Sequence, residues 1–138
     1  MGYTDIHKKL HGYFNKREWD SMDAHMRADV TYEDSPRGLT TKNIDEFKDW
    51  LREWEKSFSD AKVSHVTYFE GENFSLATFS GTGTNDGQLG PFPASKKRMD
   101  NPMWEMLHFD AEGKVASGQI MYDQVTMLGQ LGHIDLPG

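Results

Sequence analysis

The sequence has 138 residues, a formal net charge of −7 at pH 7 and no cysteine. A chain of this length predicts one domain, over residues 1–138, that buries about two-thirds of its unfolded surface. The lack of cysteine excludes disulfides, thiolate metal sites and a cysteine nucleophile, and favours a cytoplasmic location. Basic residues cluster only at 96–98, and no apolar run has the length of a membrane span. We therefore expect neither nucleic acid nor a membrane as a partner.

The first half of the chain predicts helices and one strand. Apolar residues at helical spacing predict a helix over about 3–14 and a second, short helix over about 19–26, with a break at 15–17. Residues 30–34 predict a strand that ends at the turn formers 35–38. Asn43 and Glu46 resemble a capping box, and the apolar face behind them predicts a long helix from 44 to about 59.

From residue 60 onward the apolar period changes to two and predicts strands at about 62–69, 73–84, 98–109 and 114–122. The joint 85–97 is longer and is expected to form an ordered loop or lid. Helices followed by consecutive antiparallel strands predict an α+β domain, a cone-shaped barrel in which a curved, mostly antiparallel sheet wraps around the N-terminal helices. The strands hold more rings and methionines than one core face needs, so we expect a homodimer through the sheet.

The histidines are scattered, and only His7 and His11 share helical i,i+4 spacing. Such a pair can bind a metal, but an exposed pair on a helix surface is the simpler interpretation. The sequence has no HExxH, GxSxG, phosphate-loop or EF-hand motif. We therefore expect no metal and no cofactor.

Three carboxylates fall where an apolar interior is expected. Asp34 ends the first predicted strand, Glu105 lies in the middle of another, and Asp123 ends the last. A desolvated carboxylate has a raised pKa and can exchange protons with a carbon acid near neutral pH. Each also has an ordinary explanation: a turn acceptor for Asp34, an exposed edge position for Glu105 and a helix N-cap for Asp123.

Several segments occur in the order typical of one family. They are Gly83–Leu89, Pro93, Lys97 with Arg98, Phe109 with Gly113–Val115, and Asp123 seven residues before Gln130-Leu131-Gly132. This pattern resembles the SnoaL-like polyketide cyclases, which belong to the nuclear-transport-factor-like and ketosteroid-isomerase-like superfamily. The resemblance covers nearly the whole chain. It implies the conical fold and an intramolecular aldol ring closure without metal or cofactor, with Asp123 as the acid/base.

The resemblance also places supporting polar residues around Glu105 to His108. A one-residue slip in this strand exchanges the inward set Glu105 and Leu107 for Met106 and His108, and both registers are open. The candidate catalytic residues are therefore Asp123, His108, Glu105 and Asp34. The candidate substrate-binding residues are aromatic or methionine side chains expected around the cone: Tyr13, Tyr32, Trp50, Phe79, Trp104, Met106, Met121 and Tyr122.

The expected function is a cofactor-independent cyclase or isomerase that abstracts a proton next to a carbonyl in a small hydrophobic, ring-containing substrate. One alternative is an enzyme similar to the ketosteroid isomerases, in which that resemblance makes Asp34 the base and places Glu105 at the enolate oxygen. Another is a non-catalytic module that binds a small apolar ligand or acts as a dimeric scaffold. An epoxide hydrolase of the limonene type is disfavoured, because Arg98 is the only arginine in the strand region.

Overall fold

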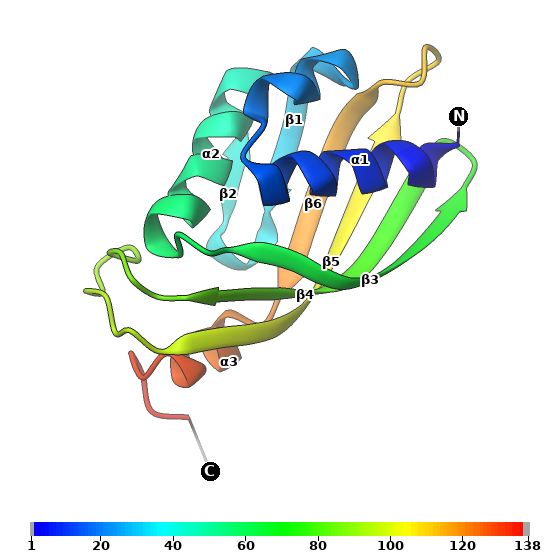
Figure 1. The fold of residues 1–138 in the computed structure, drawn as a ribbon. Helices are drawn as coiled ribbons and strands as arrows, with labels where there is room; N and C mark the ends of the chain where they lie inside the picture. The colour runs from blue at the N-terminus through cyan, green and yellow to red at the C-terminus, as the bar shows by residue number, and fades with distance from the viewer. Residues whose placement is uncertain (1, 137–138) are drawn as a thin grey trace.

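A computed structural model describes residues 2–136 and contains one curved six-stranded sheet in the order β2-β1-β6-β5-β4-β3 (Figure 1). Neighbouring strands are antiparallel, except that β1 and β6 run parallel. Because β2 and β3 are opposite edges, the sheet is open and not closed into a full barrel. The strands are β1 (Met26–Asp34), β2 (Leu39–Thr41), β3 (Lys62–Gly71), β4 (Phe74–Thr84), β5 (Arg98–Phe109) and β6 (Val115–Tyr122).

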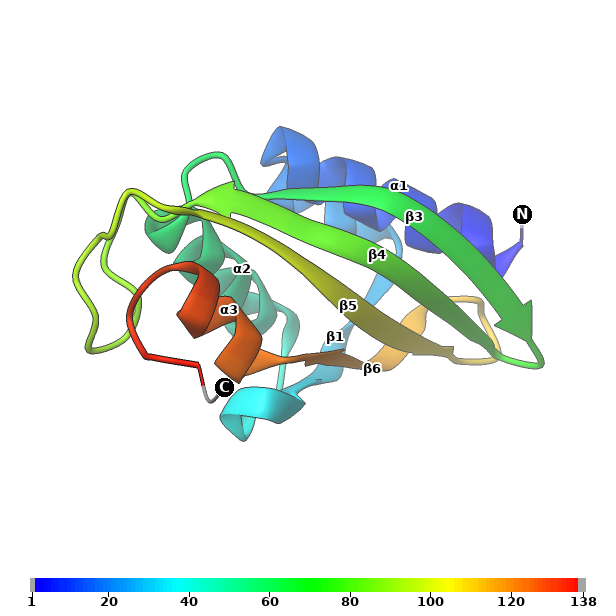
Figure 2. The same ribbon diagram turned by 90° about the horizontal axis from the view of Figure 1, so that it is seen from below.

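The two long helices cover one face of this sheet. These are α1 (Tyr3–Lys16) and α2 (Ile44–Ser57). Figure 2 looks at the opposite face, with the strands in front of both helices and the short α3 (Gln124–Gln130) beside the end of β6. This arrangement is the α+β cone predicted from the order of the elements.

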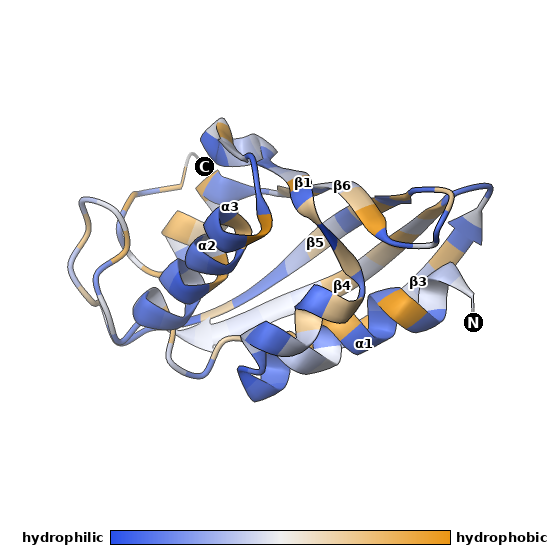
Figure 3. Ribbon diagram, turned by 90° about the horizontal axis from the view of Figure 1, so that it is seen from above, coloured by the Kyte–Doolittle hydropathy of each residue, from blue (hydrophilic) through white to orange (hydrophobic). Residues whose placement is uncertain are grey.

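Local sequence explains where the helices begin and which side they bury. The Asn43 side chain accepts a hydrogen bond of 2.9 Å from the Glu46 amide, so the predicted cap of α2 is confirmed. Behind it, Phe47, Leu51 and Trp54 are buried at helical spacing. In Figure 3, α2 presents mostly hydrophilic residues on its side away from the sheet.

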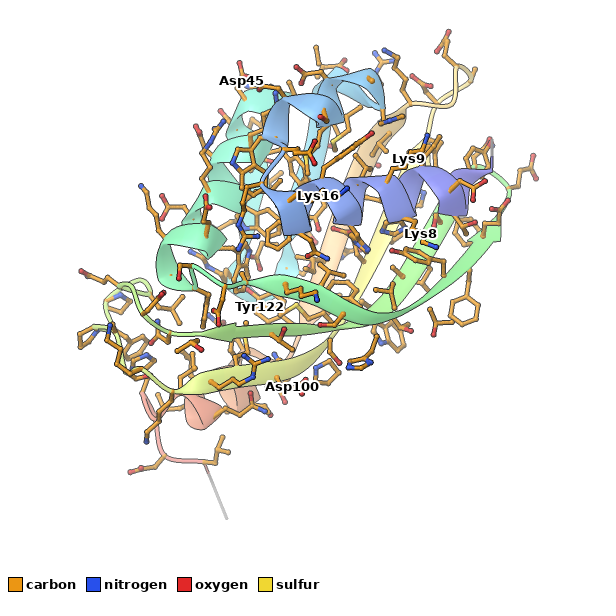
Figure 4. The ribbon with its side chains drawn as sticks, in the orientation of Figure 1. Lys8, Lys9, Lys16, Asp45, Asp100 and Tyr122 are labelled. Carbon is orange, nitrogen blue, oxygen red and sulfur yellow. The ribbon has the colours of Figure 1, made fainter. Side chains whose placement is uncertain are left out.

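The core lies between the helices and the inner face of the sheet. In Figure 4, Lys8, Lys9 and Lys16 mark α1, whose lysines are exposed, while side chains fill the space between this helix and the strands. Tyr32 and Phe58 are among the largest fully buried side chains. The aromatic side chains of the sequence thus lie mainly inside the cone.

Two segments differ from the expectation. The segment predicted as a second helix is a 3-10 helix, Trp19–Ala24, and β1 begins at Met26, four residues before the predicted strand. The reason is tertiary, because Met26 pairs with Val115 of β6. The turn formers predicted at 35–38 form a 3-10 turn at Ser35–Arg37, whereas the short β2 that follows was not predicted.

The side-chain amide of one buried residue, Asn85, holds the loop 85–97 in place. Asn85 donates to the backbone oxygens of Ser57 and Gly87 and accepts from the Ser95 amide. Its Oδ1 atom also lies 2.7 Å from His133 Nε2. These contacts tie the loop to the end of α2 and to the C-terminal segment, as expected for an ordered loop.

Among the described residues, no helix has both the length and the apolar character that crossing a membrane requires.

Candidate functional site

Strand pairing places Glu105 on the inner face of the sheet. Glu105 is opposite Ala77 of β4 and Ile120 of β6, and all three residues are buried. The alternation along β5 therefore turns Glu105 and Leu107 inward and His108 outward, where it is exposed. Of the two registers left open by the sequence, the structure has the one with Glu105 inside.

Three donors from two elements surround the Glu105 carboxylate. His7 Nε2 and His11 Nε2, one turn apart on α1, lie 2.8 Å and 2.7 Å from the same oxygen, Oε1. The Tyr32 hydroxyl on β1 donates to the other oxygen, Oε2. A buried carboxylate needs such partners, because its charge is costly in an apolar interior.

Both histidine rings are held from their other side as well. His7 Nδ1 lies 2.8 Å from Ser75 Oγ, and His11 Nδ1 lies 2.9 Å from the Tyr68 hydroxyl. The exposed fractions of His7 and His11 are 0% and 8%. The expectation of an exposed histidine pair was therefore wrong, because the face of α1 that carries them packs against the sheet.

The charges in this cluster follow from its burial and its hydrogen bonds. Burial alone would raise the pKa of Glu105, but the hydrogen bonds and charges of His11 and His7 outweigh it and hold the pKa well below its usual range. Burial lowers the pKa of His7, although Glu105 opposes this effect. Burial and the Glu105 charge raise the pKa of Tyr68 to about 12. The resting cluster is thus an ionised carboxylate beside an uncharged His7 ring and an uncharged phenol.

A pocket in the core opens onto this cluster. Its polar or charged lining residues are His11, Lys62, Thr82 and Glu105. The rest of the lining is apolar apart from Gly81 and comes from both helices and the sheet: Leu10, Phe14, Met22, Met26, Phe47, Trp50, Leu51, Trp54, Ala61, Val63, Phe79, Met99, Met103, Leu107 and Ile120. An apolar cavity with few polar groups is the usual form of a small-molecule site.

Asp34 belongs to a separate buried network. Its carboxylate accepts hydrogen bonds from Trp50 Nε1 at 3.0 Å and from the Tyr122 hydroxyl at 2.9 Å. Arg37 lies 3.7 Å away. Asp34 is 1% exposed and does not line the pocket, although its partner Trp50 does.

Asp123 caps the C-terminal helix. Its side chain accepts hydrogen bonds from the Thr126 amide at 3.0 Å and from the Thr126 hydroxyl at 2.7 Å. These two bonds lower the pKa of Asp123. The side chain is exposed and lies outside the pocket lining, so the structure does not bring Asp123 together with Glu105 or Asp34.

The structure places some of the candidate substrate-binding residues at the pocket and others on the outer face of the sheet. Trp50 and Phe79 line the pocket, and Tyr32 is buried against Glu105. The outward positions of β5 and β6 place Trp104, Met106 and Met121 on the other face of the sheet, where Trp104 and Met121 are 59% and 49% exposed. These three side chains are therefore not pocket residues in this structure. The two remaining candidates, Tyr13 and Tyr122, bond to His25 and Asp34 respectively and are not part of the lining.

Sequence reasoning missed the histidine partners of Glu105 and the hydroxyl groups that hold these histidines. His7, His11, Tyr68 and Ser75 come from α1, β3 and β4 and meet only in the folded chain. One signal was present: His7 and His11 flank Leu10 within the stripe that begins at Tyr3, so they share the buried side of the helix.

Comparison with known proteins agrees with this architecture. The profile of the SnoaL-like polyketide cyclases matches residues 4–131. The chain belongs to this family. IdmH from Streptomyces antibioticus, a candidate polyketide cyclase, has a similar structure with a TM-score of 0.80 at 17% identity, covering 96% of this chain and 99% of that chain. A candidate SnoaL-like polyketide cyclase from Jannaschia sp. CCS1 gives 0.85 at 14% identity, covering 98% and 93%.

A protein with a ketosteroid isomerase-like fold from Catenulispora acidiphila, crystallised with trimethylamine, gives a TM-score of 0.79 at 17% identity and covers 96% of this chain and 97% of that chain. The comparison with curated proteins gave no significant match. At these identities the structural likeness shows the fold of this SnoaL-like chain, and its chemistry has to be argued from its own residues.

Proposed function

We propose that this SnoaL-like chain is a cofactor-independent cyclase or isomerase, which moves a proton next to a carbonyl of a hydrophobic, ring-containing substrate bound in the apolar pocket. One observation carries the proposal: the pair Glu105 and His11, 2.7 Å apart, borders an otherwise mostly apolar cavity. Titratable groups in such a cavity are typical of acid–base sites. Membership of a cyclase family supports the same reaction type.

In this proposal Glu105 accepts the proton from carbon. An ionised carboxylate has about four lone-pair sites, and the donors His7, His11 and Tyr32 occupy three of them. The remaining site on Oε2 serves the substrate. Because these partners lower the pKa of Glu105, it is a weak base and suits an acidic carbon, such as one between a carbonyl and a second activating group.

The experiment measures deuterium uptake at C1 of 2-tetralone in D2O by NMR, with the purified full chain and a chelator present. C1 lies between a carbonyl and an aromatic ring, so its protons are acidic. We expect the protein to accelerate uptake and Glu105→Gln to reduce the protein-dependent rate at least about 100-fold, the usual minimum for a general base. Glu72→Gln, an exposed carboxylate in the β3–β4 turn, is the matched control. An unchanged rate in Glu105→Gln would exclude the assigned role.

Asp123 and Asp34 remain alternative bases within the same proposal. The family resemblance assigns the acid/base to Asp123, and the isomerase resemblance assigns it to Asp34. The rates of deuterium uptake by Asp123→Asn and Asp34→Asn are compared with that of Glu105→Gln. The carboxylate whose loss reduces the rate most is the one that accepts the proton. His108 is tested in parallel by His108→Gln, since the resemblance also gave it a supporting role.

A second candidate is a module that binds a small apolar ligand without chemistry. The observation that favours it is the separation of the carboxylates, because only Glu105 borders the pocket, while Asp34 and Asp123 have their own partners. Calorimetric titration measures binding of 2-naphthol, a planar analogue of an enolate, to the pocket. Saturable binding without deuterium uptake would favour the module over the enzyme.

We further propose a homodimer through the outer face of the sheet. Trp104 of β5 and Met121 of β6 are paired across the strands and are both largely exposed. Phe69 of β3 is 53% exposed. A group of large apolar side chains on one sheet face is typical of a protein interface, and a second copy of the chain offers a matching surface.

A further inference from the structure

We propose that His7, His11 and Glu105 form a binding site for one divalent first-row transition-metal ion of the Zn²⁺ type. The sequence gave only a helical histidine pair, and fewer than three protein ligands rarely hold such an ion. The fold adds the third ligand, Glu105, from β5. This inference concerns binding and does not depend on the proton transfer proposed above.

The ligand atoms are already close to coordination distance from one another. Two imidazole nitrogens and one carboxylate oxygen all lie within 4.8 Å, and both nitrogens lie 2.7–2.8 Å from Glu105 Oε1. Around a tetrahedral ion with bonds of about 2.0–2.2 Å, neighbouring ligand atoms are roughly 3.3–3.6 Å apart. Each nitrogen therefore needs to move away from Oε1 by roughly 0.5–0.9 Å to admit the ion.

The hydrogen bonds behind the ligands permit the required tautomer. Without an ion, each ring donates a hydrogen bond from Nε2 to Glu105 and can accept a hydrogen bond from a hydroxyl at Nδ1. With an ion on Nε2, each ring must carry its proton on Nδ1 and donate it. Ser75 and Tyr68 serve both states, because a hydroxyl donates and accepts. Outer partners of this kind orient histidine ligands in metal sites.

Charge and access favour an ion that has open coordination positions. The buried Glu105 carboxylate gains a compensating cation, which reduces the cost of its burial. The pocket reaches His11 and Glu105 but is otherwise mostly apolar, so the open positions of the ion would face the cavity. Two histidines and one carboxylate suit Zn²⁺, Co²⁺ or Fe²⁺, whereas Mg²⁺ and Ca²⁺ prefer oxygen ligands.

The test uses the full chain without an affinity tag, freed of metal with a chelator that is then removed. Calorimetric titration with Zn²⁺ should give one ion per chain, and Co²⁺ should give the intense visible absorption of a four- or five-coordinate site. We expect Ser75→Ala and Tyr68→Phe to weaken Zn²⁺ binding about 10- to 100-fold. His11→Gln and Glu105→Gln should weaken it further, because they remove ligands.

His65→Asn is the control, since His65 is exposed on β3 and its left-handed backbone tolerates asparagine. It should leave both the Zn²⁺ affinity and the Co²⁺ spectrum unchanged. Circular dichroism verifies that each variant is folded. If a histidine variant does not fold, Glu105→Gln, whose side chain is close in shape to the native one, tests the loss of a ligand in its place. The proposal is overturned if wild type binds no stoichiometric Zn²⁺, or if folded His11→Gln and Glu105→Gln bind as tightly as wild type. Neither outcome bears on deuterium uptake by the chelator-treated protein.

Discussion

The hydroxyl of Tyr32 on β1 donates a hydrogen bond to Glu105 Oε2 on β5, across the intervening strand β6. The two residues are 73 positions apart in the chain, and the Tyr32 side chain is 1% exposed. This bond stabilises the ionised carboxylate and also joins the first strand of the chain to one of the two central strands of the sheet. The Glu105 cluster is therefore both part of the core and the polar end of the pocket.

Removing the Tyr32 hydroxyl should destabilise the fold. In Tyr32→Phe the carboxylate loses a donor, and hydrogen bonds to charged groups contribute about 1.5–3 kcal/mol. We expect the free energy of unfolding, measured with urea, to fall by about 2 kcal/mol. Tyr3→Phe removes a hydroxyl whose bond to Asn73 is exposed, so its effect should be much smaller. Equal effects of the two substitutions would contradict the importance of the buried bond.

Acid should destabilise the protein in two steps. The pKa of His7 in the folded state is lowered below 6.5 by burial, so the unfolded chain binds a proton more readily and stability falls as the pH drops below about 6.5. The folded pKa of Glu105 is also lowered, despite burial, by its histidine partners. Its contribution is therefore present above about pH 4.5 and is lost as the pH falls further.

Urea unfolding from pH 8 to pH 2, with a chelator present, covers both steps. His7→Gln should flatten the slope between about pH 6.5 and 5. His25, whose pKa burial also lowers, adds to the same slope, and His25→Gln provides the comparison. A His7→Gln variant with the wild-type slope would show that His7 does not titrate as described.

The caps of α2 and α3 can be tested apart from the pocket. Asn43→Ala removes the bond to the Glu46 amide and should lower the free energy of unfolding by about 1 kcal/mol. Asp123→Asn retains a capping oxygen and should change the melting temperature little, whereas Asp123→Ala should lower it. If Asp123→Asn abolishes deuterium uptake while the melting temperature is unchanged, Asp123 has a catalytic role that its position in this structure does not explain.

The proposed dimer predicts a change of mass in solution. Trp104→Glu places a charge on the outer face and should convert a dimer into a monomer in light scattering coupled to gel filtration. Deuterium uptake should persist, because Trp104 does not line the pocket. Lys8→Glu, a charge change on the exposed side of α1, should leave the mass unchanged. A monomeric wild type would exclude the dimer at the concentrations used.

Much of the fold was predictable because local periodicity carries it. The long helix behind Asn43 and the strands β3 to β6 lie close to their predicted bounds. The short helix predicted over about 19–26 is a 3-10 helix at Trp19–Ala24, and its last predicted residue, Met26, belongs to β1, where it pairs with Val115. Such a pairing between distant residues has no local signature.

The candidate site was predictable only in part. The sequence alone identified Glu105 as one of a few carboxylates within apolar segments, and it placed His7 and His11 on one side of a helix. The apolar stripe of that helix indicated its buried side, but the sequence did not determine what this side packs against, or which residues of β5 point inward. Those choices depend on the packing of α1 against the sheet and on the pairing of β5 with β4 and β6. Only the tertiary structure brings the two histidines to the carboxylate, because hydrogen bonds between residues more than 90 positions apart form only once the sheet and the helix have packed together.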